Sequence, residues 1–249
     1  MDLKSKIMVI LGVCMLLCVS SYFLIVKMFD NLETQLFEKC RIEAFIGAKV
    51  TGETINLLID SARLSEKDAF DTTYIPIPNT SPQKYTTRYD RLLDRYLQGI
   101  IDEFLKDPDI DYAVPVDING YVPTHNSRYS VPSTGDQGKN LWQSRSKRIF
   151  DDPVGITAAR HRGEGTIKQL YNRDTGETMW DISAPIRVRG NHWGAFRVGV
   201  SLQRVEGMKN QMVILIGMSL LVILSITMLI LFLIIPRKLY DTDLDIPKY

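Results

Sequence analysis

Two long apolar stretches without a charged residue, one near each end of the chain, constrain this sequence more than any other feature. They cover residues 7–26 and 212–235. An α-helix rises about 1.5 Å per residue, so about 20 apolar residues cross the hydrocarbon core of a bilayer. Inside lipid the backbone must satisfy its own hydrogen bonds, which favours a helix in each stretch. The sequence therefore predicts two transmembrane helices, at residues 7–27 and 212–235.

The first stretch has a competing interpretation as a cleaved signal peptide, because Lys4 and Lys6 precede it. Its apolar run is long for a signal core and no small-residue cleavage motif follows, which favours an uncleaved anchor. Basic residues also follow the second stretch, at Arg237 and Lys238. The positive-inside tendency then places both termini in the cytoplasm and the middle of the chain in the periplasm of a bacterium.

This topology, in a bacterial inner membrane, predicts five segments. They are a cytoplasmic N-terminus (1–6), a transmembrane helix (7–27), a periplasmic domain (28–209), a second transmembrane helix (212–235) and a short cytoplasmic tail (236–249). The middle domain contains Cys40 as its only cysteine, so it cannot form a disulfide within itself. Its length is sufficient for a hydrophobic core of its own.

The middle domain begins with helical periodicity. Apolar residues recur at intervals of three and four over residues 29–64 without a proline, which predicts one long helix, or two in line, growing out of the first membrane span. Prolines and hydroxyl residues mark residues 71–86 as a loop. Residues 88–106 are again helical with one apolar face, and a short helix is expected near residues 141–149.

The period changes to that of β-strands after Asp111. Runs of strand-forming residues, separated by turn signals such as Asn119-Gly120 and Gly190-Asn191, predict an antiparallel sheet joined mostly by hairpins. Helices on one side of such a sheet define the α+β class. The five expected strands are residues 112–118, 121–125, 166–173, 178–189 and 192–202.

Charge is distributed unevenly over the middle domain. Residues 28–127 hold ten basic and seventeen acidic side chains, whereas residues 128–204 hold thirteen basic and seven acidic. The two halves can attract each other as solvated faces of one domain. The alternative is a basic pocket on the sheet that favours an anionic small molecule. The sequence leaves both interpretations open.

Four segments carry a family resemblance: GYVPTHN (120–126), RSKRIFDDPVG (145–155), YNRDTGETMWDISAPI (171–186) and GNHWGAFRVG (190–199). With the order of helices and strands, they resemble the extracytoplasmic PAS-like (Cache) sensor regions of bacterial methyl-accepting chemotaxis proteins. The resemblance covers nearly the whole chain. It implies ligand sensing outside the membrane and signal transduction, as in chemotaxis.

The sequence departs from that family in two ways. Chemotaxis receptors continue into a HAMP linker and a cytoplasmic signalling domain, whereas this sequence ends at Tyr249, shortly after Pro236. We therefore expect no output domain within it and a separate membrane or cytoplasmic signalling protein as partner. Some relatives bind haem through a C-x-x-C-H motif, which this sequence lacks, so no cofactor is expected.

A ligand pocket on such a sheet would be walled by aromatic side chains and closed by a few polar groups. Arginine suits a carboxylate because its planar fork donates two parallel bonds. An aspartate accepts from a ligand amine or from an arginine. The alternative for each of these side chains is a core or structural role. The candidate ligand-binding residues are Tyr121, His125, Trp142, Arg145, Arg148, Tyr171, Asp181 and Trp193.

The remaining polar motifs give little sign of catalysis. The adjacent acids Asp151 and Asp152 point apart and are expected to cap a helix or a turn, with a salt bridge to Arg145 or Arg148. The sequence contains no metal-ligand cluster, no phosphate-binding glycine loop and no framed nucleophile, so an enzyme is not expected.

Three interpretations of function follow. The first is a membrane-anchored sensor of a small anionic organic molecule, forming a homodimer through the apolar stripe of its long helix, without nucleic acid as a partner. The second is a membrane-anchored scaffold or accessory subunit whose outer domain binds a protein. The third is a receptor cut short and without function. A polar-lined cavity on the sheet favours the first, and a collapsed interior with an exposed apolar patch favours the second.

Overall fold

The computed structural model describes residues 3–235, and the chain divides into two compact units. Unit 1 comprises Met1–Glu33 and Glu206–Tyr249, and unit 2 comprises Thr34–Val205. The predicted cytoplasmic tail (236–249), with Pro236, Arg237 and Lys238, lies outside the described residues. The helices are α1 (Leu3–Asp60), α2 (Glu66–Ala69), α3 (Asp90–Tyr96), α4 (Gln98–Phe104), α5 (Gln137–Gln143), α6 (Pro153–Arg160) and α7 (Leu202–Ile234).

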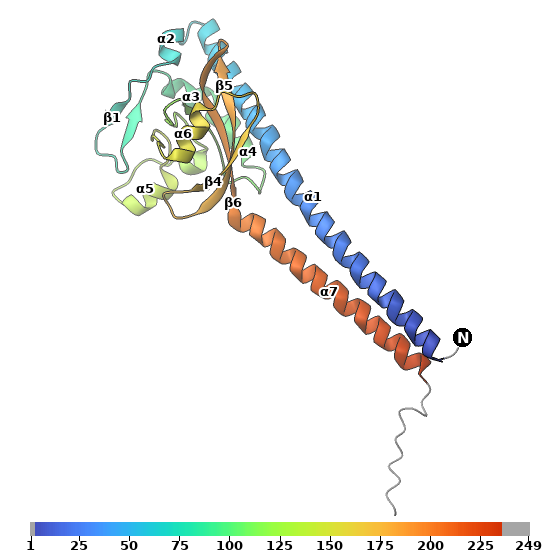
Figure 1. Ribbon diagram of the computed structural model, residues 1–249. Helices are drawn as coiled ribbons and strands as arrows, with labels where there is room; N and C mark the ends of the chain where they lie inside the picture. Colours follow the sequence, from blue (N-terminus) through green and yellow to red (C-terminus); the bar gives the residue numbers. More distant parts are fainter. Residues whose placement is uncertain (1–2, 236–249) are drawn as a thin grey trace, which may run out of the picture. The chain divides into compact units, whose positions relative to one another are not determined.

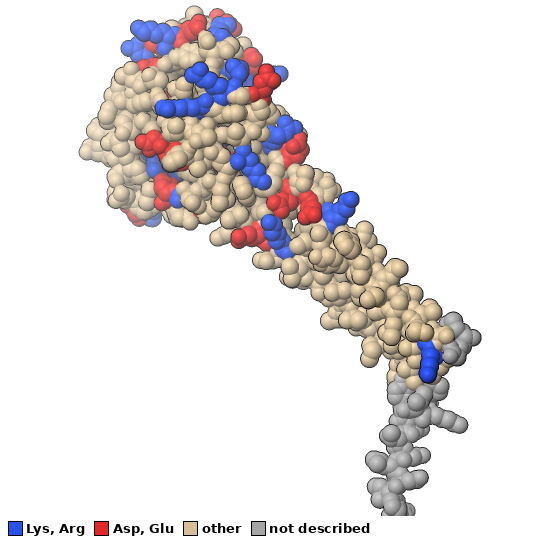
Figure 2. All heavy atoms as spheres, in the orientation of Figure 1, with Lys and Arg blue, Asp and Glu red and all other residues tan. Residues whose placement is uncertain are grey.

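Unit 1 consists of two helical segments, the first part of α1 and most of α7. Both helices contain a stretch long and apolar enough to cross a membrane. The hydroxyl of Ser21 donates to the hydroxyl of Ser219 at 3.0 Å, so the two segments lie side by side (Figure 1). Figure 2 shows a long surface without charged side chains along them, as contact with lipid requires. The predicted apolar helices are therefore present as helices.

Unit 2 contains a four-stranded antiparallel sheet with strand order β3-β6-β5-β4. Its strands are β3 (Tyr112–Asp117), β4 (Ile167–Asn172), β5 (Thr178–Val188) and β6 (Asn191–Ser201). Arg189 and Gly190 both take positive φ, 51° and 76°, which forms the two-residue turn that joins β5 to β6. The turn therefore lies one residue earlier than the predicted Gly190-Asn191.

One face of the sheet is covered by α1 and α4. The approach of α1 depends on Gly47, because a Cβ there would lie 2.1 Å from Cε1 of Phe196 on β6. Phe104 of α4 packs against the same Phe196, with ring centroids 5.3 Å apart. Nearer unit 1, Phe37 of α1 meets Trp180 of β5 edge-on at 5.6 Å. These contacts fill the space between helix and sheet.

The opposite face of the sheet supports a second part of the core. Val114, Val116 and Ala195 are buried there together with Ala159 of α6, which packs across β4, β5 and β6. The start of α6 follows the expected cap chemistry, since Asp152 Oδ1 accepts from the N–H groups of Val154 and Gly155, both at 3.0 Å. The capping role expected for Asp152 is thus confirmed.

The predicted fifth strand at residues 121–125 is wrong. Tyr121 makes only an isolated bridge with Ile149. Val122 exchanges backbone hydrogen bonds with Arg148 and Lys147, at 2.9 and 2.7 Å, and not with β3. Pro123 then has no N–H to continue a ladder. The chain after β3 therefore leaves the sheet and becomes a wall over its face.

Four other local predictions differ from the structure. The expected loop at 71–86 contains a small antiparallel pair, β1 (Ile75–Ile77) and β2 (Lys84–Thr86). The helix expected over 88–106 is split at Leu97 into α3 and α4. The short helix expected at 141–149 is α5, which starts earlier because Asp136 caps it by accepting from Lys139 N at 3.1 Å. The long helix α1 ends at Asp60, four residues before the predicted end at Leu64.

The substitution Gly47→Ala is expected to destabilise unit 2 by about 1–3 kcal/mol, because the added methyl group collides with the buried ring of Phe196. The matched control is Gly99→Ala in α4, where a Cβ meets no atom within 4 Å and stability should not fall. Thermal unfolding of both full-length variants in detergent measures the difference. Equal unfolding temperatures would contradict the close packing of α1 on β6.

Candidate ligand-binding site

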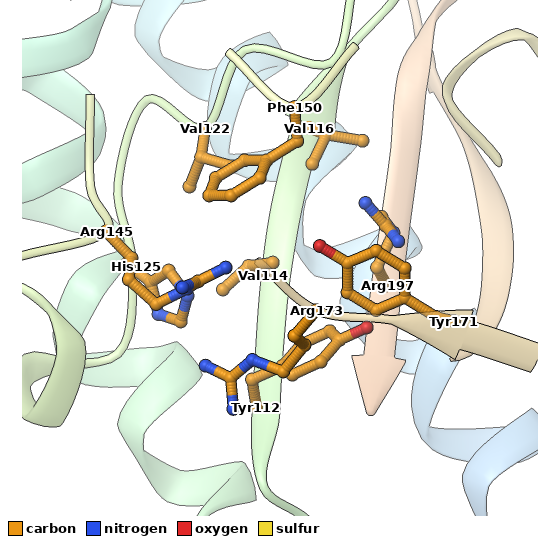
Figure 3. A pocket seen from close by; sticks show the side chains of 10 residues that line it. All are labelled: Tyr112, Val114, Val116, Val122, His125, Arg145, Phe150, Tyr171, Arg173 and Arg197. Atoms are coloured by element: carbon orange, nitrogen blue, oxygen red, sulfur yellow. The ribbon is translucent and has the colours of Figure 1, made fainter. Parts of the chain in front are cut away.

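A small cavity lies on the sheet face opposite α1 and α4 (Figure 3). Its volume is about 20 Å³, which is room for about one water molecule. The side chains around it come from β3, β4 and β6, from the turn after β4 and from the long connection between β3 and β4. They are Tyr112, Val114, Val116, Val122, His125, Arg145, Phe150, Tyr171, Arg173 and Arg197.

Strand alternation brings three of these side chains to one face of the sheet. Tyr112 of β3 lies opposite Gly199 of β6. A Cβ on Gly199 would lie 2.0 Å from Cε1 of Tyr112, so this glycine provides the space for the ring. Arg197 precedes Gly199 by two residues and shares its face. The guanidinium of Arg197 lies 5.1 Å from the ring centroid of Tyr171 on β4.

A buried ion pair forms the floor of the cavity. Arg197 Nε donates to Asp181 Oδ2 at 2.7 Å, and its Nη2 lies 2.6 Å from the same oxygen. The two side chains are 4% and 0% exposed. A charge buried this deeply is stable only with its partner, and removing one member of such a pair costs roughly 3–5 kcal/mol.

The turn between β4 and β5 supplies a second arginine. Arg173 N donates to Glu177 O at 2.8 Å, and Gly176 takes a φ of +88°, which closes the turn. The Arg173 side chain is 3% exposed, and its Nη1 contacts Glu177 Oε2 at 2.8 Å. Its Nη2 is buried and has no hydrogen-bond partner among the residues that the structure describes. This nitrogen is therefore a charged donor available to a ligand.

The same turn holds Asp174, which binds two further arginines. Arg145 Nη1 and Arg148 Nη2 contact its two carboxylate oxygens at 2.7 and 2.6 Å. Burial opposes ionisation of Asp174, but the guanidiniums of Arg145 and Arg148 hold the pKa of its carboxyl below the ordinary value. Both guanidiniums lie over the ring of Phe150, at 4.9 and 4.7 Å from its centroid. The site already binds one carboxylate in this way.

His125 is buried beside these cations and is 4% exposed. Burial, followed by the positive charges of Arg145 and Arg173, lowers the pKa of its imidazole well below the usual value. The ring is therefore neutral near pH 7. Its Nδ1 has no hydrogen-bond partner, and its ring stacks obliquely on Tyr129 at 4.9 Å. It offers a second unused polar atom to a ligand.

The ion pairs around the cavity contain one more guanidinium than carboxylate. Four guanidiniums face three carboxylates, and the difference is +1. The groups are Arg145, Arg148, Arg173 and Arg197 against Asp174, Glu177 and Asp181. Among residues 3–235, no three His, Cys, Asp or Glu side chains come together in a way that could hold a metal ion.

The structure brings together five of the eight residues predicted from the sequence. His125, Arg145 and Tyr171 line the cavity. Asp181 pairs with the cavity residue Arg197, and Arg148 covers Phe150 from the side. Whether these side chains bind a ligand stays a prediction.

The other three predicted residues lie away from this cavity. The Tyr121 hydroxyl contacts Tyr85 O at 3.0 Å and Asp90 Oδ2 at 3.1 Å. Trp142 is 44% exposed on α5. The indole N–H of Trp193 donates to Ala69 O at 2.8 Å. The sequence did not place these three relative to the cavity, because an aromatic residue by itself does not reveal which of several neighbours its side chain packs against.

Sequence reasoning missed three polar cavity residues: Tyr112, Arg173 and Arg197. The position of Arg197 could have been predicted from the sequence, because alternation puts it on the same face of β6 as Ala195 and Gly199. Arg173 had the signal of a hairpin turn beside an acidic residue. Tyr112 had none, since its place over Gly199 depends on strand register.

No protein-family model matches the chain, and no curated protein sequence matches it significantly. Among solved structures, it is similar to the ligand-binding domain of the Campylobacter jejuni chemoreceptor Tlp3 in complex with 4-methylisoleucine, with 9% identity and a TM-score of 0.48 over 77% of this chain and 63% of that one. It is also similar to the DcuS sensor domain of E. coli, with 18% identity and a TM-score of 0.33 over 46% of this chain and 72% of that one.

A third similar structure is an extracellular ligand-binding receptor from Desulfohalobium retbaense, with 11% identity and a TM-score of 0.45 over 77% of this chain and 27% of that one. This chain therefore spans less than two thirds of the Campylobacter and Desulfohalobium structures. All three neighbours are sensory or ligand-binding domains. At these levels of similarity they do not assign a ligand to this chain.

Unit 2 is expected to lose stability as the pH falls below about 6.5, the ordinary pKa of histidine. Below that pH the unfolded chain protonates His125, whereas the folded state keeps it neutral, so the unfolded state binds more protons. This residue then removes up to about 1.4 kcal/mol of unfolding free energy per pH unit. Denaturant unfolding at several pH values measures the slope, and His125→Gln should flatten it. Identical slopes in both proteins would refute the buried neutral imidazole.

Proposed function

We propose that this chain is a membrane-anchored sensor that binds a small organic anion, such as a monocarboxylate, in the arginine-lined cavity of unit 2. The observation that supports it best is Arg173 Nη2, a buried charged donor without a partner beside other arginines. Buried donors of this kind are normally satisfied, so an unsatisfied one indicates a missing acceptor. The surplus of one positive charge fits a single carboxylate.

Because the cavity is small, binding of an organic anion requires the cavity to change its shape. Its volume of about 20 Å³ is too small for an organic anion, so a ligand must move at least one wall. The turn that holds Arg173 and the connection that holds His125 are the walls outside the sheet. A ligand that is bound better by the widened state shifts the population toward it. The proposed role is therefore binding coupled to a conformational change, without chemistry on the ligand.

The conformational change at the cavity can pass directly along the chain from β6 to α7. Arg197 lies in β6, which ends at Ser201, and α7 begins at Leu202 without a linker. Arg204 in the first turn of α7 lies 3.5 Å from Asp109, measured from Nη1 to Oδ1. A shift of β6 would thus alter the position of the first turn of α7, which continues into the proposed membrane span.

We further propose that both apolar helices span the bacterial inner membrane, with unit 2 in the periplasm and both termini in the cytoplasm. The basic residues Lys4 and Lys6 at the start of the chain support this orientation. A topology reporter inserted at the exposed Asn79 is expected on the periplasmic side, and one fused after Tyr249 on the cytoplasmic side. Alkaline phosphatase and fluorescent-protein fusions measure the two positions. Reporters on the same side would refute this topology.

A second copy of the chain is the proposed protein partner. Ile42, Ile46 and Leu57 of α1 are 47%, 50% and 65% exposed. Their spacings of four and eleven residues keep them on one side of the helix. The same stripe favours the runner-up function, a scaffold that binds a different protein, and cross-linking of Ile42→Cys copies distinguishes the two partners.

Calorimetric titration of the full-length protein with monocarboxylates and amino acids tests the proposed ligand class. At least one monoanion should bind saturably. Arg173→Gln should weaken it at least tenfold, because a hydrogen bond to a charged group is worth about 1.5–3 kcal/mol. The matched control is Arg189→Gln, on the turn between β5 and β6, which should bind as the unaltered protein does. Absence of binding across the panel, or equal affinity in both variants, would count against the proposal.

A further inference from the structure

A second cavity, four times the volume of the first, lies where β3 ends and β6 begins. Its volume is about 80 Å³, against about 20 Å³ for the arginine-lined cavity. Asp117 and Ile118 at the end of β3, Trp193 of β6 and the residues after α2 line it. Tyr89, just before α3, completes an aromatic wall with Trp193, at a ring-centroid distance of 5.6 Å.

Asp117 is the buried acid of this cavity. Burial raises the pKa of its carboxyl, and the hydrogen bonds that its oxygens accept oppose that rise. The residue is 3% exposed. Its carboxylate accepts from the hydroxyls of Tyr74 and Tyr89, at 2.7 and 2.9 Å, and from the backbone N–H groups of Asn119 and Tyr121, at 2.9 and 3.0 Å. Among the described residues it makes no ion pair. These four neutral donors hold the oxygens in place and leave the negative charge without a counter-ion.

Besides Asp117, the cavity wall holds Asp71 and Thr72, and two side chains, His192 and Trp193, that have already used their N–H donors. His192 Nε2 lies 2.8 Å from Ala159 O, and a carbonyl only accepts, so this nitrogen carries the proton. Burial lowers the pKa of His192, which keeps the ring neutral. Its buried Nδ1 is therefore a bare lone pair without a partner. Trp193 has used its indole N–H on Ala69 O.

We propose that this second cavity binds a small primary alkylammonium ion. The ammonium group would face Asp117 and donate to His192 Nδ1, and its alkyl group would lie against the rings of Tyr89 and Trp193. A cation held over aromatic faces gains electrostatic attraction in addition to apolar contact. A cavity of about 150 Å³ holds benzene, so one about half that size suits methylammonium or ethylammonium.

The two cavities have opposite chemistry although both are lined by β3 and β6. Val116 and Arg197 belong to the anion cavity, and their near neighbours Asp117 and Trp193 belong to the second cavity. The ammonium site does not rest on the proposed anion-sensing function. Each cavity has its own charge, its own unpartnered side-chain atoms and its own variants for a test.

Calorimetric titration of the full-length protein with methylammonium and ethylammonium chloride tests the proposal, with sodium chloride at equal concentration as the reference. Saturable binding of at least one ammonium ion is expected. Asp117→Asn should weaken it at least tenfold, because the charge is lost while the amide oxygen can still accept from the turn backbone. Ile118→Phe alters no hydrogen bond of Asp117 and should also abolish binding, because the ring fills the cavity.

Arg173→Gln is the matched control, and it should leave ammonium binding unchanged. Conversely, Asp117→Asn and Ile118→Phe should leave anion binding at the first cavity unchanged. If neither ammonium ion binds saturably, or if Ile118→Phe binds as tightly as the unaltered protein, the ammonium site does not exist. Equal loss in Arg173→Gln would place the cation elsewhere and overturn the assignment to the second cavity.

Discussion

The buried pair between Arg197 and Asp181 is the interaction on which the arrangement of unit 2 depends. It crosses from β6 to β5 on the face of the sheet that lines the first cavity, with both side chains nearly inaccessible to solvent. Each buried charge stabilises the other, and the pair joins the two strands through side chains in addition to their backbone ladder. It also places a guanidinium beneath the first cavity. The polar character of that cavity therefore originates in the sheet itself.

Around this floor, the walls come from segments that make few ladder contacts. The chain after β3 turns away at Tyr121 and carries His125 over the sheet. The turn after β4 carries Arg173 and Asp174, and Asp174 gathers Arg145 and Arg148. Binding sites are commonly carried by a rigid scaffold and closed by loops, because loops can move without breaking the core. In this protein the turn after β4 and the connection after β3 hold most of the charged side chains around the cavity.

The sequence predicted the larger elements well, for identifiable reasons. The apolar stretches at 7–26 and 212–235 and the periodicity of 29–64 are local patterns, and they correspond to α7 and the single helix α1. The hairpins around Gly176 and Gly190 have local turn chemistry, so β4, β5 and β6 were found. The prediction of a strand at 121–125 was wrong, because the alternation of side chains does not identify the segment with which a chain pairs. Pairing of Val122 with Arg148 depends on chain segments far apart in sequence.

For the site, composition alone indicated a basic half of the domain, and the arginines at 145, 148, 173 and 197 all fall in it. The sequence thus determined the kind of charge available and the helices and hairpins that carry it, because these follow from neighbours along the chain. Only the tertiary structure decided which charges are neutralised. Asp174 pairs with two arginines and Asp181 with one, whereas Asp117 makes no ion pair among residues 3–235, because strand register and the paths of the loops set these distances.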